Sequence, residues 1–137
     1  MQPRLNVREE DIKMLYIENF RSAFSLFQAI KEMELEISEL KKQRENEESE
    51  KIKEILSGRI DCIEYNVAIA SGTLAEVEDF ISKCDDPLAR QILYSRYLKG
   101  NTWEKTAYLT GGYISEECAR KIAERYLQKM GVERRKA

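Results

Sequence analysis

Residues 99–130 have the sequence KGNTWEKTAYLTGGYISEECARKIAERYLQKM, and the expected fold is built around them. Asn101 and Thr102 can each cap the N-terminus of a helix, because their side-chain oxygens accept hydrogen bonds from backbone N–H groups. Gly111 and the glycine after it provide a reversal of the chain that few other residues tolerate. Ser115 is a second capping residue. The stretch therefore predicts two short helices joined by a glycine turn.

The second of these helices is expected to be amphipathic. Its apolar residues recur at steps of three and four, and they are Cys118, Ala119, Ile122, Tyr126 and Met130. Its other side carries charged and amide side chains, which are Glu116, Glu117, Arg120, Lys121, Glu124 and Gln128. A short helix, a glycine turn and a second helix with a long polar face form the pattern of the helix-turn-helix motif, whose second helix enters the major groove of DNA.

At these residues the chain resembles the C-terminal helix-turn-helix of sigma factors, known as region 4, and small phage and mobile-element regulators of the RinA/ArpU type. The matching residues are Thr102, Glu104, Ala107, Gly111, Ser115, Glu117, Arg120, Ile122, Leu127 and Lys129. The chain departs from the family pattern at Thr106, where an aliphatic residue is usual, and at Lys121, where Gln is usual. Gly112-Tyr113 resembles an insertion of two residues in the turn. The resemblance covers roughly the last third of the chain and implies a DNA-binding module behind a helical arm, with base contacts by Glu117 and Lys121.

The composition favours long helices and separates the charges of the two halves. Charged residues make up 35% of the 137 residues, and there are only 6 Gly and 2 Pro to form turns. Residues 87–137 hold 11 Lys and Arg against 5 Asp and Glu, a balance of +6. Because the whole chain has a net charge of −2, residues 1–86 carry −8. This asymmetry indicates a polyanionic partner for the C-terminal part.

The residue inventory argues against several classes of protein. The chain has no His, and the spacing of Cys62, Cys84 and Cys118 matches no metal-ligand set, which excludes Cys/His zinc fingers, Ser-His-Asp triads and Cys-His pairs. We expect the cysteines to be small buried hydrophobic residues, and we expect no enzymatic activity, no cofactor and no metal. No apolar run has the length of a membrane span and the N-terminus has no signal-peptide core, so the expected location is cytoplasmic, away from the membrane.

Residues 1–86 are expected to form a helical hairpin arm. Apolar residues recur at helical spacing between Tyr16 and Leu40, and the aromatic Phe20 and Phe27 in this repeat are expected in the core. A second, clearer repeat has the alternating steps of a coiled-coil seam, and it consists of Ile52, Leu56, Ile60, Ile63, Val67, Ala70, Leu74, Val77 and Ile81. Two glycines, at 58 and 72, do not shift its register, so one helix is predicted, with a bend near Ser71-Gly72 left open. A chain reversal near residues 46–49 would pack the two repeats against each other.

An antiparallel hairpin is sufficient to explain both repeats. A second hypothesis, about as well supported, is that the arm also joins two copies of the chain. A two-helix hairpin alone buries little apolar surface, and a two-fold dimer is the commonest way to bury more.

The predicted fold class is therefore all-α, with a long coiled-coil-like helical hairpin arm at residues 1–86 and a small helix-turn-helix domain at residues 87–137. Asp86 can cap the first helix of this domain with Pro87 at its first position, and Gly100 can end that helix. The core of the domain is expected to contain Tyr97, Trp103, Leu109, Ile122 and Tyr126.

Two functions compete at this stage. In the first, the protein is a sequence-specific binder of double-stranded DNA and regulates transcription in a phage or mobile element. The base-reading residues would then be Glu116, Glu117, Arg120, Lys121 and Glu124, because Arg and Lys can donate to guanine and Glu can accept from cytosine. Phosphate contacts are expected from Thr102, Lys105, Ser115, Arg125, Lys129, Arg134, Arg135 and Lys136, and further ones from Arg90, Arg96 and Lys99. In the second, the helices bind a protein such as RNA polymerase, in the manner of a sigma or anti-sigma partner, with no direct readout of DNA.

Overall fold

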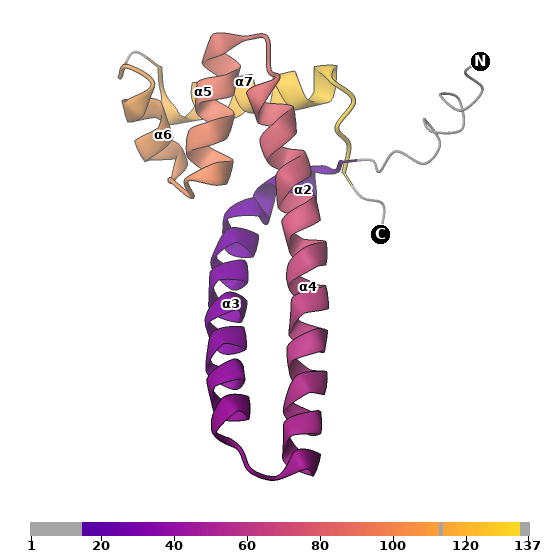
Figure 1. The fold of residues 1–137 in the computed structure, drawn as a ribbon. Coiled ribbons are helices and arrows are strands. Elements are labelled where there is room, and N and C mark those ends of the chain that lie inside the picture. The colour runs from indigo at the N-terminus through magenta and orange to yellow at the C-terminus, as the bar shows by residue number, and fades with distance from the viewer. Residues whose placement is uncertain (1–14, 113, 135–137) are drawn as a thin grey trace, which may run out of the picture.

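The structure, a computed structural model, describes residues 15–112 and 114–134 (Figure 1). In this part of the chain the regular elements are all helical, and they are α2 (Ile17–Arg21), α3 (Ala23–Asn46), α4 (Glu50–Ser82), α5 (Pro87–Leu93), the π-helix η1 (Tyr94–Leu98), α6 (Trp103–Leu109) and α7 (Glu116–Lys129). The predicted class, all-α with a long helical hairpin followed by shorter helices, is confirmed. None of the described helices combines the length and the apolar character needed to cross a bilayer.

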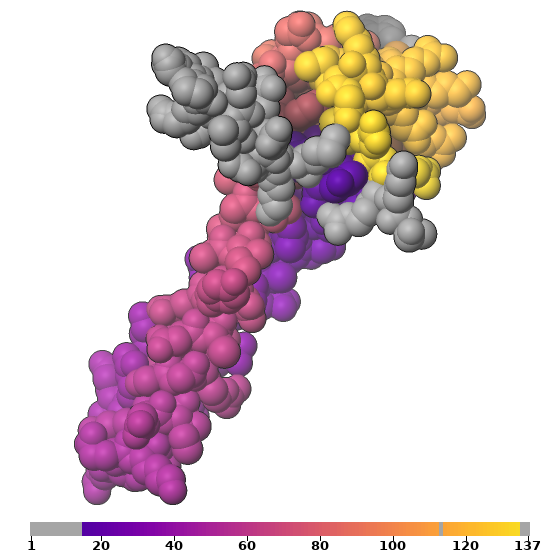
Figure 2. Space-filling model, turned by 90° about the vertical axis from the view of Figure 1, so that its right-hand side faces the viewer, coloured from indigo at the N-terminus to yellow at the C-terminus, as the bar shows by residue number. Residues whose placement is uncertain are grey.

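The arm consists of α3 and α4, which lie side by side as an antiparallel hairpin (Figure 1). The chain reverses at residues 47–49, as predicted, and Ser49 caps α4 by accepting a hydrogen bond from Ile52 N at 3.3 Å. The seam buries Ile30 and Leu40 of α3 with Ile60 of α4. α4 runs unbroken for 33 residues, a length of about 50 Å. Together α3 and α4 form a long rod (Figure 2), and over most of its length α4 packs against α3 alone among the described elements.

Polar contacts across the hairpin hold its register without adding much stability. Arg44 Nη1 donates a hydrogen bond to Ser57 Oγ at 3.0 Å near the tip. Arg59 pairs with Glu36 at 3.5 Å, and both side chains are about half exposed. Exposed ion pairs of this kind contribute about 0–1 kcal/mol each, so the apolar seam carries the association of the two helices.

Several predicted core residues are exposed instead. Ile52 is 44% exposed because it lies opposite the hairpin loop, where α3 has no residue to cover it. Phe27 is 40% exposed at the edge of the arm, and Lys31 Nζ lies 4.7 Å from the centre of its ring. Leu109 is 47% exposed because it ends α6 at the turn. Cys62 is exposed as well, on the side of α4 that faces away from the seam, so only one of the three cysteines, Cys84, is fully buried as expected.

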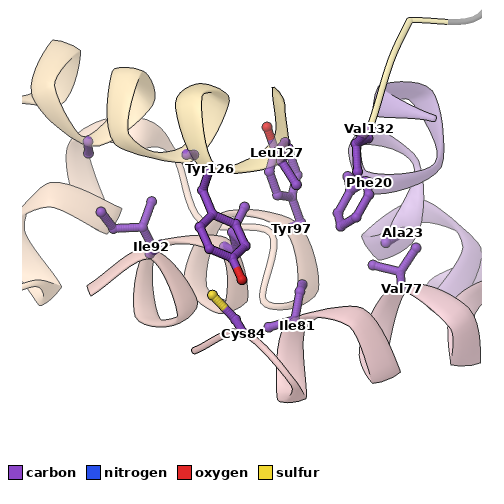
Figure 3. Close-up of a cluster of buried hydrophobic side chains, with 14 of the residues drawn as sticks. Phe20, Ala23, Val77, Ile81, Cys84, Ile92, Tyr97, Tyr126, Leu127 and Val132 are labelled. Atoms are coloured by element: carbon purple, nitrogen blue, oxygen red, sulfur yellow. The ribbon is translucent and has the colours of Figure 1, made fainter. Parts of the chain in front are cut away.

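The head consists of residues 87–134 together with α2, the start of α3 and the end of α4. One cluster of buried side chains runs through all of these segments (Figure 3). Phe20 is fully buried at its centre, and its ring lies edge-on to Phe80 at 5.2 Å and to Tyr97 at 5.9 Å between centroids. Val77 from the arm and Leu127 from α7 belong to the same cluster. The hydrophobic core therefore extends across residue 86, and the division into two domains at that residue stays a prediction.

The corner between arm and head is built as the sequence predicts. Asp86 caps α5, its Oδ1 accepting hydrogen bonds from Leu88 N at 3.0 Å and Ala89 N at 3.2 Å, and Pro87 occupies the first helical position. Gly100 follows the last helical turn at a φ of +74°, a conformation that favours glycine. A Cβ atom at Gly100 would come within 2.6 Å of the Phe24 ring. Glycine is thus required here both by the backbone and by the approach of α3.

The two ends of the described chain meet beside α2. Ile17 N donates a hydrogen bond to Glu133 O at 2.9 Å, and Tyr16 and Glu133 form an isolated parallel β-bridge. Val132 is buried in the shared core just before this bridge. The segment that leaves α7 is therefore fastened to the base of the arm.

Candidate nucleic-acid interface

The two-helix unit, which we define as α6, the glycine turn and α7, has the predicted caps. Thr102 caps α6, with its Oγ1 accepting a hydrogen bond from Lys105 N at 3.1 Å. Ser115 caps α7, with its Oγ accepting from Cys118 N at 3.0 Å. Gly111 and Gly112 have φ angles of +98° and +73°, which a residue with a Cβ adopts only with strain. Of the two candidate caps for α6, the structure uses Thr102, because Asn101 is directed to Ser95 instead.

One side of α7 is packed tightly against α5 and α6. Ala119, Ala123 and Leu127 are fully buried along this side. Ala119 was expected there, whereas Ala123 and Leu127 were missed, although their spacing of four residues from Ala119 indicates the same face. The two alanines are small enough to let the helix backbones approach closely. Ile122 is half-buried at the edge of this face. Met130, which was expected on the apolar side of the helix, is 50% exposed beyond the last turn.

Tyr126 ties α7 to the corner between arm and head. Its hydroxyl donates a hydrogen bond to Asp85 Oδ1 at 3.2 Å, and it points toward the Cys84 side chain (Figure 3). The Cys84 thiol beside it and burial raise the pKa of Tyr126 to about 12. The hydroxyl therefore keeps its proton near neutral pH and remains a donor to Asp85.

The opposite side of α7 faces solvent and carries every candidate base-reading residue. These five exposed side chains are Glu116, Glu117, Arg120, Lys121 and Glu124. Lys121 Nζ lies 3.5 Å from Glu117 Oε2, and both side chains are more than half exposed. A pair of this kind one helical turn apart contributes about 0.2–0.5 kcal/mol, so a stronger partner can replace it. The acidic residues of the first turn also stabilise the N-terminus of the helix through its dipole.

The candidate phosphate-binding residues lie on α6, on α7 and in the segment that follows α7. Lys105, Arg125, Lys129 and Arg134 are exposed, whereas Arg135 and Lys136 lie outside the described residues. Thr102 and Ser115 are also exposed, but their hydroxyl oxygens already accept a backbone N–H. Each hydroxyl proton can still be donated to a phosphate oxygen.

Arg96 has a role inside the head. Its guanidinium lies 4.9 Å from the centre of the Trp103 ring, and its Nη1 donates a hydrogen bond to Asn101 O at 3.1 Å. Lys99 Nζ lies 5.4 Å from the centre of the Tyr94 ring. Arg90 is exposed on α5. The Arg96 contacts hold the loop that precedes α6, a role that its charge alone does not indicate.

Thr106 belongs to a buried polar cluster inside the head. Thr106 Oγ1 lies 3.0 Å from Ser95 Oγ, and both residues are buried. Asn101 Nδ2 donates a second hydrogen bond to Ser95 Oγ at 3.0 Å. Ser95 lies in η1, where the hydrogen bond from Lys99 N to Tyr94 O spans five residues. The Thr106 hydroxyl thus gives the buried Ser95 hydroxyl of η1 a hydrogen-bond partner inside the head.

We expect Thr106→Val to lower the free energy of unfolding by about 1–3 kcal/mol, although valine has nearly the same shape and is more apolar. The substitution leaves the buried Ser95 hydroxyl without one of its partners. Urea denaturation followed by circular dichroism measures the change. The Ser95→Ala/Thr106→Val double variant should lose less than the sum of the two single variants, and a more stable Thr106→Val protein would contradict the role of this cluster.

The described surface also has a groove beside α5. A groove of about 650 Å³ lies between α4 and α5, and Ile81, Pro87, Tyr94 and Leu98 are among its lining residues. Within residues 15–112 and 114–134, no three acidic or cysteine side chains converge as a metal site.

Comparisons of the chain with protein-family models, with curated proteins and with solved structures found no significant match.

Proposed function

We propose that the protein is a sequence-specific binder of double-stranded DNA, a transcriptional regulator of phage or mobile-element type, which reads the major groove with α7. The observation that carries this proposal is the two-sided character of α7. Three small or aliphatic residues anchor one side in the head, and the polar residues of the first two turns are exposed on the other. A helix held in this way presents its N-terminal turns to a groove without rearranging the core.

The exposed side chains of α7 suit the chemistry of base edges. The guanidinium of Arg120 can donate two hydrogen bonds to the O6 and N7 atoms of a guanine. Lys121 can donate to the same atoms once it leaves Glu117, and Glu117 can then accept from the N4 amino group of cytosine. The weak pair between these two residues is therefore ready to be exchanged for base contacts.

Phosphate contacts would supply affinity without sequence information. Lys105 on α6 and Arg125 and Lys129 on α7 are exposed, and none of the three takes part in an ion pair within the described chain. The net charge of +6 in residues 87–137 attracts a polyanion to this part of the molecule.

We also propose that two copies of the chain associate through the arm.

The alternative is a protein-interaction module that binds RNA polymerase or a sigma or anti-sigma partner and does not read DNA. The observation that favours it is the apolar groove between α4 and α5, where Tyr94 is 45% exposed. In that case the charged face of α7 is only a solvated surface. Direct measurement of DNA binding distinguishes the two functions.

The test uses the full chain, because Phe20 and Val77 from outside residues 87–137 belong to the core of the head. Fluorescence anisotropy with a labelled random duplex is measured at several salt concentrations. We expect log K to fall linearly with log salt, because bound phosphates release their counterions. No binding even at low salt would reject DNA binding and favour the protein-partner alternative.

Neutralising the tail should lower this salt dependence. We expect the Arg134→Gln/Arg135→Gln/Lys136→Gln variant to bind all duplexes more weakly and to reduce the salt slope by up to about 3. The control is a matched triple substitution on the arm, Lys41→Gln/Lys42→Gln/Lys53→Gln, which should leave the slope unchanged. Equal slopes for the tail variant and the unmodified protein would mean that the tail does not approach phosphate.

A further inference from the structure

The side of α4 that faces away from α3 carries a second apolar repeat, which we call the outer stripe and define by Ile55, Cys62, Tyr65 and Ile69. These residues are exposed, by 57% for Ile55, 67% for Tyr65 and 50% for Ile69. Together with the glycines at 58 and 72 they follow one another at steps of three, four, three, four and three. This is the spacing of a coiled-coil seam on a second face of the same helix.

No described part of the chain covers the outer stripe. α3 packs on the other face of α4, and the arm stands beyond the head on its own (Figure 1). A Cβ atom added at Gly58 or Gly72 would meet nothing within 4 Å. Neither glycine is therefore needed for packing within the chain, although each costs about 1 kcal/mol of helix stability relative to alanine.

We propose that the outer stripe binds the outer stripe of a second copy of this chain, with the two α4 helices antiparallel. This deepens the proposal that two copies associate through the arm. In the antiparallel register, two residues of the two copies face each other when their residue numbers add up to 127. Ile55 then faces Gly72 of the second copy, Gly58 faces Ile69, and Cys62 faces Tyr65.

This register pairs large side chains with small ones in every layer. Each isoleucine enters the space that a glycine leaves, and each tyrosine ring lies over a cysteine, so the two helices keep an even separation. A parallel pair would instead set tyrosine against tyrosine and glycine against glycine. Bulky layers would then alternate with empty ones, and unfilled space between helices is destabilising.

The charges at the ends of the stripe favour the same orientation. The next residues in the repeat are Lys51 on one side and Glu76 on the other, and in the antiparallel register they face each other. In a parallel pair Glu76 would face Glu76. Glu76 is half-buried, so a lysine opposite it is favoured over a second glutamate. From residue 51 to residue 76 the contact extends over about 38 Å of helix.

Sedimentation equilibrium of the full chain tests the contact without DNA. We expect a dimer that loses its association, by about tenfold or more in dissociation constant, when Ile69→Glu puts two charges into the interface. The helicity and melting temperature of the monomer should not fall, because Ile69 is half exposed. Leu35→Glu on α3, where the leucine is 67% exposed, is the matched control and should leave the dimer intact. A monomer at all concentrations, or equal dissociation by both variants, would overturn the proposal even if the protein binds DNA.

Disulfide trapping tests the orientation. In a Cys62→Ser background treated with diamide, the Ile55→Cys/Gly72→Cys double variant should form covalent dimers, because residue 55 faces residue 72 of the second copy. The Ile55→Cys and Gly72→Cys single variants should not do so. Within one helix these two positions are about 26 Å apart and cannot join. Efficient trapping by either single variant would mean a parallel pair and would overturn the antiparallel register.

Discussion

Phe20→Ala is expected to lower the free energy of unfolding by about 3–5 kcal/mol. The ring is fully buried between Phe80 and Tyr97, where α2, the end of α4 and η1 meet. Its removal leaves a cavity in the cluster that joins the arm to the head, and it also removes two edge-to-face ring contacts. Chemical denaturation measures the loss, and the midpoint should shift without a change in the folded helical content.

Phe27→Ala is the matched control for this prediction. Phe27 lies seven residues further along the chain, in α3, and is 40% exposed. We expect it to cost less than about 1 kcal/mol. Equal losses for the two variants would show that the arm and the head do not depend on a common core around Phe20.

Arg120→Ala is expected to erase most of the preference for the cognate DNA site while leaving the fold unchanged. A bidentate contact with guanine is worth about 1–3 kcal/mol of discrimination, or about 5–150-fold in relative affinity. Because Arg120 is exposed and makes no ion pair in the described chain, its removal should not change the melting temperature. The measurement is competition between a selected cognate duplex and a scrambled one at fixed salt.

Arg125→Ala provides the comparison for this experiment. Arg125 lies on the same helix, is also exposed and is a candidate phosphate contact. Its removal should weaken binding to both duplexes by similar factors and leave their ratio unchanged. If Arg120→Ala keeps the ratio of the unmodified protein, this residue does not read a base, and the proposed entry of α7 into the major groove is wrong.

The parts of the fold that depend on neighbours in sequence were predictable. Ser115 and Asp86 cap helices because each needs only backbone N–H groups two or three residues away. The α4 helix passes through Gly58 and Gly72 because the apolar repeat keeps its register across both. The hairpin reversal at 47–49 follows because two facing apolar repeats need to cover each other. The exposed polar side of α7 follows in the same way from a period of 3.6 residues.

Contacts between segments that are distant in sequence, or that compete for the same partner, could not be predicted. The apolar repeat predicts that Phe20 and Phe27 are both buried. In the structure Phe80 and Tyr97 pack around Phe20, whereas Phe27 lies at the edge of the arm and is partly exposed. The same holds for Arg96, whose charge suggests a phosphate contact until Trp103 is found beneath it.

The all-α class, the hairpin arm, the caps, the glycine turn and the exposed polar side of α7 could be predicted from the sequence, because hydrogen bonds to nearby backbone and helical periodicity depend on short stretches of chain. The tertiary structure decided that the core continues from the arm into the head, that Thr106 serves a buried hydroxyl of η1, and that one apolar stripe of α4 stays exposed. The physical reason is that burial depends on which surfaces the whole chain brings together, and a single repeat cannot say which of two apolar faces of a helix will be covered.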